Sequence, residues 1–232
     1  MSLPKLIQSL LFISGLAFFN LSYGEVVGTW KVEGSTPFKV YYKNDKRLRM
    51  DVGNGTYMLV VDDKAYSVMN QGGQLMVMDM SAMGGAMQAF GGMAMGQAQS
   101  QAEKYDPNSV TINKTGKTEV IAGIKGDVYK VTVKGPNGME TTEFVASTNK
   151  EVVTLQKAFH LISQRMAQSM MNDKMLAGFD RYTDMVEERN IGGMMRYGNH
   201  MTLQSVANED VPDTLFEIPK NATMMSIPGF GR

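Results

Sequence analysis

The sequence predicts an α+β fold in which one strongly curved antiparallel sheet packs on a long amphipathic helix. From residue 26 to residue 80, apolar and polar side chains alternate with a period of two, and short turn-like segments interrupt the alternation. This pattern is typical of antiparallel strands joined by tight turns. From residue 151 to residue 182 the apolar side chains recur every three or four positions, which indicates a helix with one apolar face.

The first strand set is a meander with one apolar, aromatic face and one charged face. Leu48 and Met50, for example, alternate with Arg47 and Arg49, so the two pairs point to opposite sides of a strand. The strands are expected at residues 26–33, 38–43, 47–52, 57–61, 65–69 and 74–80.

A second strand set leads into the helix. It comprises residues 110–114, 118–122, 127–134 and 139–147, and the turn-forming Pro136, Asn137 and Gly138 precede its last strand. The apolar stripe of the helix consists of Leu155, Phe159, Ile162, Met166 and Met170. A last strand is expected near residues 200–207. This order of elements favours a single domain over residues 25–232.

Residues 1–24 have the features of a secretory signal peptide. Lys5 is the only charged residue, an apolar run from Leu10 to Phe19 follows, and small residues precede a cleavage point after Gly24. The run is too short to cross about 30 Å of hydrocarbon. Exported animal proteins of this size are usually rich in disulfides, whereas this chain has no cysteine. We therefore expect an exported protein of the bacterial periplasm.

Composition excludes several classes of function. The 23 basic and 23 acidic residues balance, so the chain lacks the charge of a nucleic-acid-binding protein. The absence of cysteine excludes zinc–thiolate sites, iron–sulfur clusters and cysteine nucleophiles. The two histidines, His160 and His200, lie in different predicted elements, and neither accompanies a catalytic motif. We expect a monomer that is not an enzyme, needs no cofactor and has at most peripheral membrane contact.

Residues 81–104 form a segment rich in methionine and glycine. Met83, Met87 and Phe90 recur at helical spacing, but each glycine inside a helix costs roughly 1 kcal/mol relative to alanine. We expect a mobile flap that becomes helical only when its methionine face is covered. The alternative is a low-complexity loop without regular structure.

The methionines allow two interpretations. Thioether sulfur is a soft ligand that suits Cu(I). The main candidate ligands are then Met76, Met78, Met80, Met83 and Met87, and further candidates are Met93, Met95, Met166, Met170, His200 and Met201. Methionine is also an adaptable apolar side chain that serves on surfaces accepting varied partners. Composition does not separate a metal site from packing.

Three stretches resemble the bacterial DUF4412 family, whose function is unknown. They are residues 38–51, with an Arg-Met-Asp strand, residues 115–129, beginning Thr-Gly-Lys-Thr-Glu, and residues 211–219, Val-Pro-Asp-Thr-Leu-Phe-Glu-Ile-Pro. The chain departs from the family pattern at Ile124 and Gly126, where the family often has Tyr and Cys. The resemblance implies a fold similar to the periplasmic lipoprotein carriers LolA and LolB, in which an incomplete barrel encloses an apolar cavity.

These observations together predict a periplasmic protein that binds a hydrophobic small molecule or lipid, or a periplasmic protein partner, between sheet and helix. A protein that binds or buffers soft metal is the alternative. The expected ligand-binding residues are Trp30, Phe38, Tyr42, Leu48, Met50, Met83, Met87, Phe90, Phe159, Ile162 and Met166.

Overall fold

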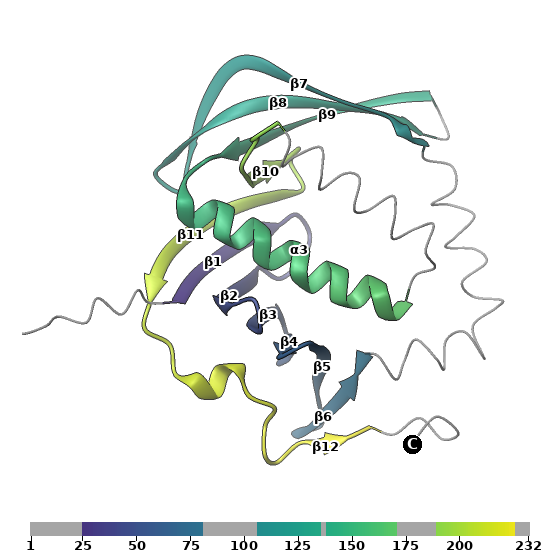
Figure 1. Ribbon diagram of the computed structural model, residues 1–232, viewed down its shortest axis with the longest axis vertical. Helices are drawn as coiled ribbons and strands as arrows, with labels where there is room; N and C mark the ends of the chain where they lie inside the picture. The colour runs from purple at the N-terminus through teal and green to yellow at the C-terminus, as the bar shows by residue number, and fades with distance from the viewer. Residues whose placement is uncertain (1–24, 81–105, 136–137, 171–188, 226–232) are drawn as a thin grey trace, which may run out of the picture.

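The computed structural model describes residues 25–80, 106–135, 138–170 and 189–225, and these residues form one large, open, mostly antiparallel sheet with one α-helix (Figure 1). The expected signal peptide, the flap and residues 171–182 of the expected helix lie outside the described residues. The strands are β1 (Glu25–Val32), β2 (Phe38–Asn44), β3 (Arg47–Gly53), β4 (Thr56–Val61), β5 (Lys64–Gln71), β6 (Gln74–Asp79), β7 (Asp106–Ile121), β8 (Ile124–Gly135), β9 (Gly138–Ser147), β10 (Gly193–Tyr197), β11 (Met201–Glu209) and β12 (Thr223–Met224). The helix is α3 (Lys150–Met170), and a 3₁₀-helix, η1, covers Asp213–Phe216.

The sheet joins the two predicted strand sets through its C-terminal strands. Its order is β12-β6-β5-β4-β3-β2-β1-β11-β10-β9-β8-β7, so β11 and β10 lie between the β1–β6 meander and the β7–β9 hairpins. All described strand pairs are antiparallel except β6 with β12, which is parallel. The prediction of an antiparallel sheet is therefore confirmed for all but this short edge pair, and β10 and β12 are strands that the sequence did not reveal.

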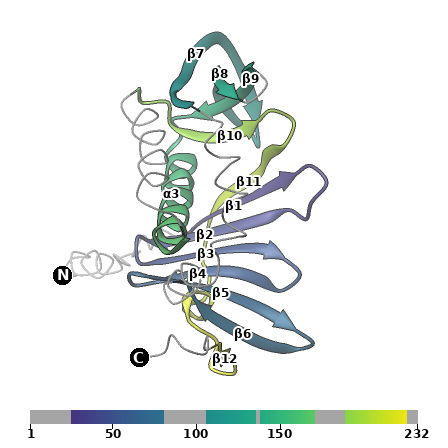
Figure 2. The same cartoon turned by 90° about the vertical axis from the view of Figure 1, so that its right-hand side faces the viewer.

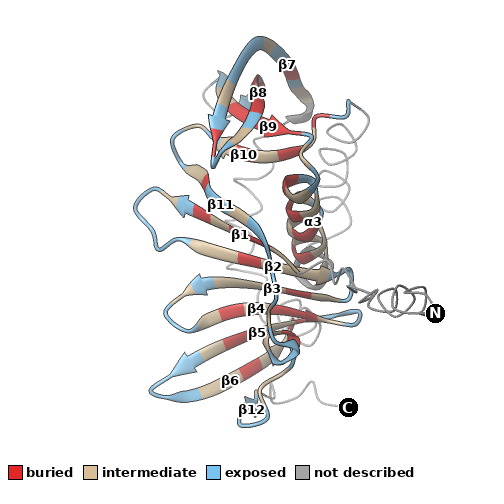
Figure 3. Cartoon of the chain, turned by 90° about the vertical axis from the view of Figure 1, so that its left-hand side faces the viewer, coloured by how far each residue is buried: buried red, intermediate tan, exposed pale blue. Residues whose placement is uncertain are grey.

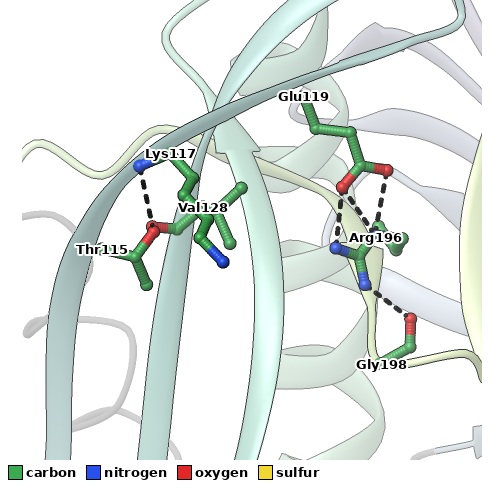
Figure 4. Close-up of polar contacts among 6 residues, drawn as sticks. All are labelled: Thr115, Lys117, Glu119, Val128, Arg196 and Gly198. Atoms are coloured by element: carbon green, nitrogen blue, oxygen red, sulfur yellow. Dashed lines mark hydrogen bonds and ion pairs between the residues drawn. The ribbon is translucent and has the colours of Figure 1, made fainter.

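Strand β7 corrects the prediction of two separate strands at 110–114 and 118–122. The pairing with β8 continues on both sides of an irregularity between Lys114 and Thr118. Gly116 has a φ of 79° there, which glycine adopts readily. The Thr115 hydroxyl donates to the Val128 carbonyl at 2.8 Å and accepts the Lys117 amide N–H at 3.2 Å (Figure 4). The turn-like residues between Lys114 and Thr118 therefore form a bulge inside one long strand and do not separate two strands.

The sheet curls strongly at its β7 end. Strands β8 and β9 separate β7 from β10 in the sheet order, yet Glu119 of β7 binds Arg196 of β10. The guanidinium makes three contacts of 2.8–3.2 Å with both carboxylate oxygens, and it also donates to the Gly198 carbonyl at 2.9 Å (Figure 4). A flat sheet would keep these strands too far apart for this contact. The predicted strong curvature is present at this end, as Figure 1 also shows.

Helix α3 packs across the strands on one side of the sheet, which we call the inner face (Figures 2 and 3). The Asn149 side chain accepts the Val152 amide N–H at 3.1 Å and so caps the first turn. Leu155, Ala158 and Ile162 are buried in the main core cluster. The helix approaches β1 closely at Gly28, where an added Cβ would lie 2.5 Å from Leu155 Cδ1.

The opposite, outer face is not the purely charged surface that the alternation predicted. Leu59, Val68 and Val77 are buried there, and Ile218 and Ala222 of the C-terminal segment pack against them. Phe216 of η1 is fully buried. The chain after β11 therefore covers part of the outer face of the meander and shields these apolar side chains from water. Residues 57–61, which are apolar without interruption, carry the signal of a strand buried on both faces.

Candidate functional site

The inner face carries a row of side chains in register across five strands, and all of them except Ser67 are apolar. Directly opposed residues of an antiparallel pair point to the same face, and successive pairings connect Val40 with Met50, Met50 with Met58, Met58 with Ser67, and Ser67 with Met78. Val40 is buried in the core with α3. The other four side chains of this row, on β3 to β6, are half-buried, so the described residues leave them partly open to solvent.

Three aromatic rings from the sheet and the helix meet beside this row. Trp30 stacks on Phe38 with ring centroids 5.3 Å apart, and Phe159 of α3 contacts both rings edge-on at 4.9 and 5.4 Å. Such contacts add to the stability that comes from burial alone. The Trp30 indole N–H is buried and has no hydrogen-bond partner. Phe38 and Phe159 remain half-buried, so this aromatic corner has both a packed side and an accessible side.

The structure divides the predicted ligand-binding residues into three groups. Trp30, Leu48 and Ile162 are at most 2% exposed and belong to the packed core. The half-buried residues Phe38, Tyr42, Met50 and Phe159 pack against that core, so the structure brings them together as predicted neighbours. Met83, Met87 and Phe90 lie outside the described residues, as does the side chain of Met166, whose backbone is in α3.

A polar cluster closes one end of the inner face. The Tyr42 hydroxyl donates to Asp45 Oδ1 at 2.5 Å, and Lys157 Nζ of α3 lies 2.7 Å from Asp45 Oδ2. Burial, together with the hydrogen bond to Asp45, raises the pKa of Tyr42. The hydrogen bond from Lys157 lowers the pKa of Asp45. Asp45 is therefore a carboxylate at neutral pH and holds α3 to the turn between β2 and β3.

Among the predicted metal ligands, Met76 and Met78 are half-buried on β6 and Met80, just after β6, is 4% exposed. The sequence interpretation missed Met58 and Met69. Met69 of β5 lies directly opposite Met76, and Met58 of β4 lies opposite Ser67, which in turn pairs with Met78. The alternation of Met58 with the buried Tyr57 and Leu59 was visible in the sequence, but its cross-strand partners were not. Pairing register depends on turn geometry as well as on pattern.

A hollow lies beside the β7–β9 hairpins. It has a volume of about 440 Å³, and its described lining comprises Ile112, Lys114, Asp127, Tyr129, Thr148, Arg189, Asn190 and Ile191. Its two cations already have partners: Lys114 Nζ lies 2.7 Å from Asp127, and Arg189 donates to the Ile112 carbonyl at 2.8 Å. This hollow therefore offers little unpaired charge to a ligand.

The described residues were also searched for a metal-binding cluster and for a membrane-spanning helix. No group of three histidine or carboxylate side chains within them could hold a metal ion. The described part of the chain also has no helix with the length and apolar character needed to cross a bilayer.

Comparison with protein-family models, with curated proteins and with solved structures finds no match.

Proposed function

We propose that the chain is an exported, periplasmic, non-enzymatic binding protein that holds an apolar ligand, such as a lipid acyl chain, on the inner face of the sheet beside α3. One observation carries this proposal. The half-buried side chains Phe38, Met50, Met58 and Phe159 come from sheet and helix and are contiguous with a fully packed core. A LolA-like half-barrel is the fold proposed to present them.

The energetics suit an acyl chain. Removing one methylene from water contributes about 0.8 kcal/mol, so ten buried methylenes contribute about 8 kcal/mol before the entropic cost of association. Methionine side chains adapt to ligands of varied shape because they are unbranched and have three rotatable bonds. A surface of Phe and Met over a rigid sheet therefore favours chains of varied length over one rigid ligand.

The test introduces a charge on this surface and a matched charge elsewhere. Met50→Lys places an ammonium among the half-buried apolar side chains, whereas Val120→Lys places one on β7 at a side chain that is 68% exposed. We expect Met50→Lys to abolish saturable binding of a fluorescent fatty acid and Val120→Lys to leave it unchanged. Circular dichroism and thermal melts of both variants establish that the fold persists.

Two results would contradict the proposal. One is equal probe binding by Met50→Lys and Val120→Lys. The other is the absence of saturable probe binding by the unaltered protein, together with no lipid in native mass spectra of the protein purified from periplasm. A protein ligand instead of a lipid would appear in those spectra as a complex that Met50→Lys disrupts.

A further inference from the structure

Ser67 is a small residue with methionines on three sides. Met58 of β4 and Met78 of β6 are its direct cross-strand partners, and Met69 is two positions further along β5, on the same face. All four residues are half-buried. Because the serine side chain is short, the space above it on the inner face is bounded by three long thioether side chains.

The spacing allows the three sulfur atoms to converge. Directly opposed residues have Cβ atoms roughly 4.5–5.5 Å apart, and residues two positions apart on a strand are separated by about 6.6–6.8 Å. Methionine has three rotatable bonds, so each thioether can lean over Ser67 from its own strand. The fold supplies this arrangement from three separate strands, and no residue outside the described ranges is needed for it.

We propose that Met58, Met69 and Met78 form a three-thioether site for a soft monovalent cation, Cu(I) or Ag(I), above Ser67. Thioether sulfur favours soft ions, whereas carboxylate and carbonyl oxygen suit Mg²⁺ and Ca²⁺. The neighbouring carboxylate Asp79 alternates with Met78 and bonds Lys64 at 3.5 Å on the other face. The donor set is therefore neutral and all-sulfur, which selects against hard divalent ions.

This site goes beyond the proposed binding of an acyl chain and differs from the ligand set expected from sequence, which included neither Met58 nor Met69. Ordinary apolar packing is the competing account of the same methionines. The two accounts differ in one respect: packing depends on apolar volume, which leucine shares with methionine, whereas metal binding depends on sulfur and on the short side chain of Ser67 between the three thioethers.

The experiment is an anaerobic titration with Cu(I) against a competing chromophoric chelator, repeated with Ag(I) by calorimetry. The test variant is Met58→Leu/Met69→Leu/Met78→Leu. The control, Met139→Leu/Met194→Leu/Met224→Leu, removes as many thioethers from other described positions. A third variant, Ser67→Val, keeps every sulfur atom and fills the space between them.

We expect one ion per chain to bind the unaltered protein and the control, and Zn²⁺ to bind neither at this site. The test triple should lose affinity by more than the roughly 100-fold that removal of an outer-shell partner costs a metal site. Ser67→Val should weaken binding without loss of any ligand. If the test triple fails to fold, Ser67→Val decides the question.

The proposal is overturned if the unaltered protein binds no Cu(I) or Ag(I), or if the test triple and Ser67→Val both bind as the unaltered protein does. Binding of the fluorescent fatty acid is measured separately on the unaltered protein and on the control triple, none of whose residues is placed in the acyl-chain surface, and should persist in both. Failure of the metal site therefore leaves the acyl-chain proposal intact, and failure of fatty-acid binding leaves the metal result unaffected.

Discussion

At the scale of single residues, small side chains decide how closely the layers approach. Gly28 sits under α3, and a Cβ there would lie 2.5 Å from Leu155 and 2.7 Å from the Trp30 ring. Gly126 is similar, because a Cβ there would lie 2.3 Å from the Met195 methyl group. Neither position has the positive φ that would require glycine for backbone reasons, so close packing alone accounts for both.

Gly28→Ala tests this explanation. The added methyl group would have to displace Leu155 or the Trp30 ring, both of them packed in the core, and overpacking of this kind costs about 1–3 kcal/mol. We expect urea denaturation to show a loss of that size. Ser205→Ala, on the exposed side of β11, should change the free energy of unfolding by less than about 0.5 kcal/mol. Equal effects of the two changes would refute the packing explanation.

At the scale of elements, α3 is held over the sheet by its apolar stripe and by ion pairs at two strand turns. Lys157 pairs with Asp45 at 2.7 Å, and Arg165 pairs with Asp63 at 3.1 Å. The two acidic residues follow β2 and β4, so both pairs lie in turns at the same end of the meander strands. They fix the direction of the helix across the strands, whereas Leu155 and Ile162 supply the buried area.

The Asp45–Lys157 pair makes a small, pH-dependent contribution to stability. The hydrogen bond from Lys157 lowers the pKa of Asp45 in the folded protein below the value of about 3.9 that aspartate has in an unfolded chain. Its contribution is therefore fully present above about pH 4 and is lost as the pH falls through the lower, folded-state pKa. Both side chains are 52% exposed, so the pair is worth at most about 1 kcal/mol.

We expect Asp45→Asn to lower the free energy of unfolding by less than about 1 kcal/mol at pH 7. The difference from the unaltered protein should shrink as the pH falls below about 4, where the parent carboxylate becomes protonated. Urea denaturation at a series of pH values measures this difference. A difference that stays constant down to the most acidic pH would show that Asp45 acts without its charge.

At the scale of the whole molecule, local sequence patterns predicted where the strands and the helix lie in the chain better than they predicted which strands pair with each other. The alternation around Met50 gave the strands of the meander with nearly the observed bounds, and the helical spacing of Leu155 and Phe159 gave the start of α3. The half-buried contact of Phe38 with Phe159 agrees with the predicted inner surface. These features are local or follow directly from one apolar face packing on another.

The features that the sequence did not reveal depend on long-range pairing. Strand β10 has five residues and lies between β9 and β11, and Glu119 meets Arg196 only because the sheet curls. Ser67 looked like an ordinary polar position until pairing placed methionines on both sides of it. Short strands and cross-strand neighbours are set by tertiary contacts, which no single segment of sequence encodes.

The central claim is that an acyl chain binds on the inner face beside α3. The only tryptophan in the sequence, Trp30, is buried in the core directly against Phe38 and Phe159 of that surface. Titration with a fatty acid that carries a nitroxide on its chain measures this directly, because the nitroxide quenches tryptophan emission only at short range. The account predicts saturable quenching of Trp30 that unlabelled fatty acid reverses and that Met50→Lys removes. Unquenched Trp30 emission at saturating ligand would contradict it.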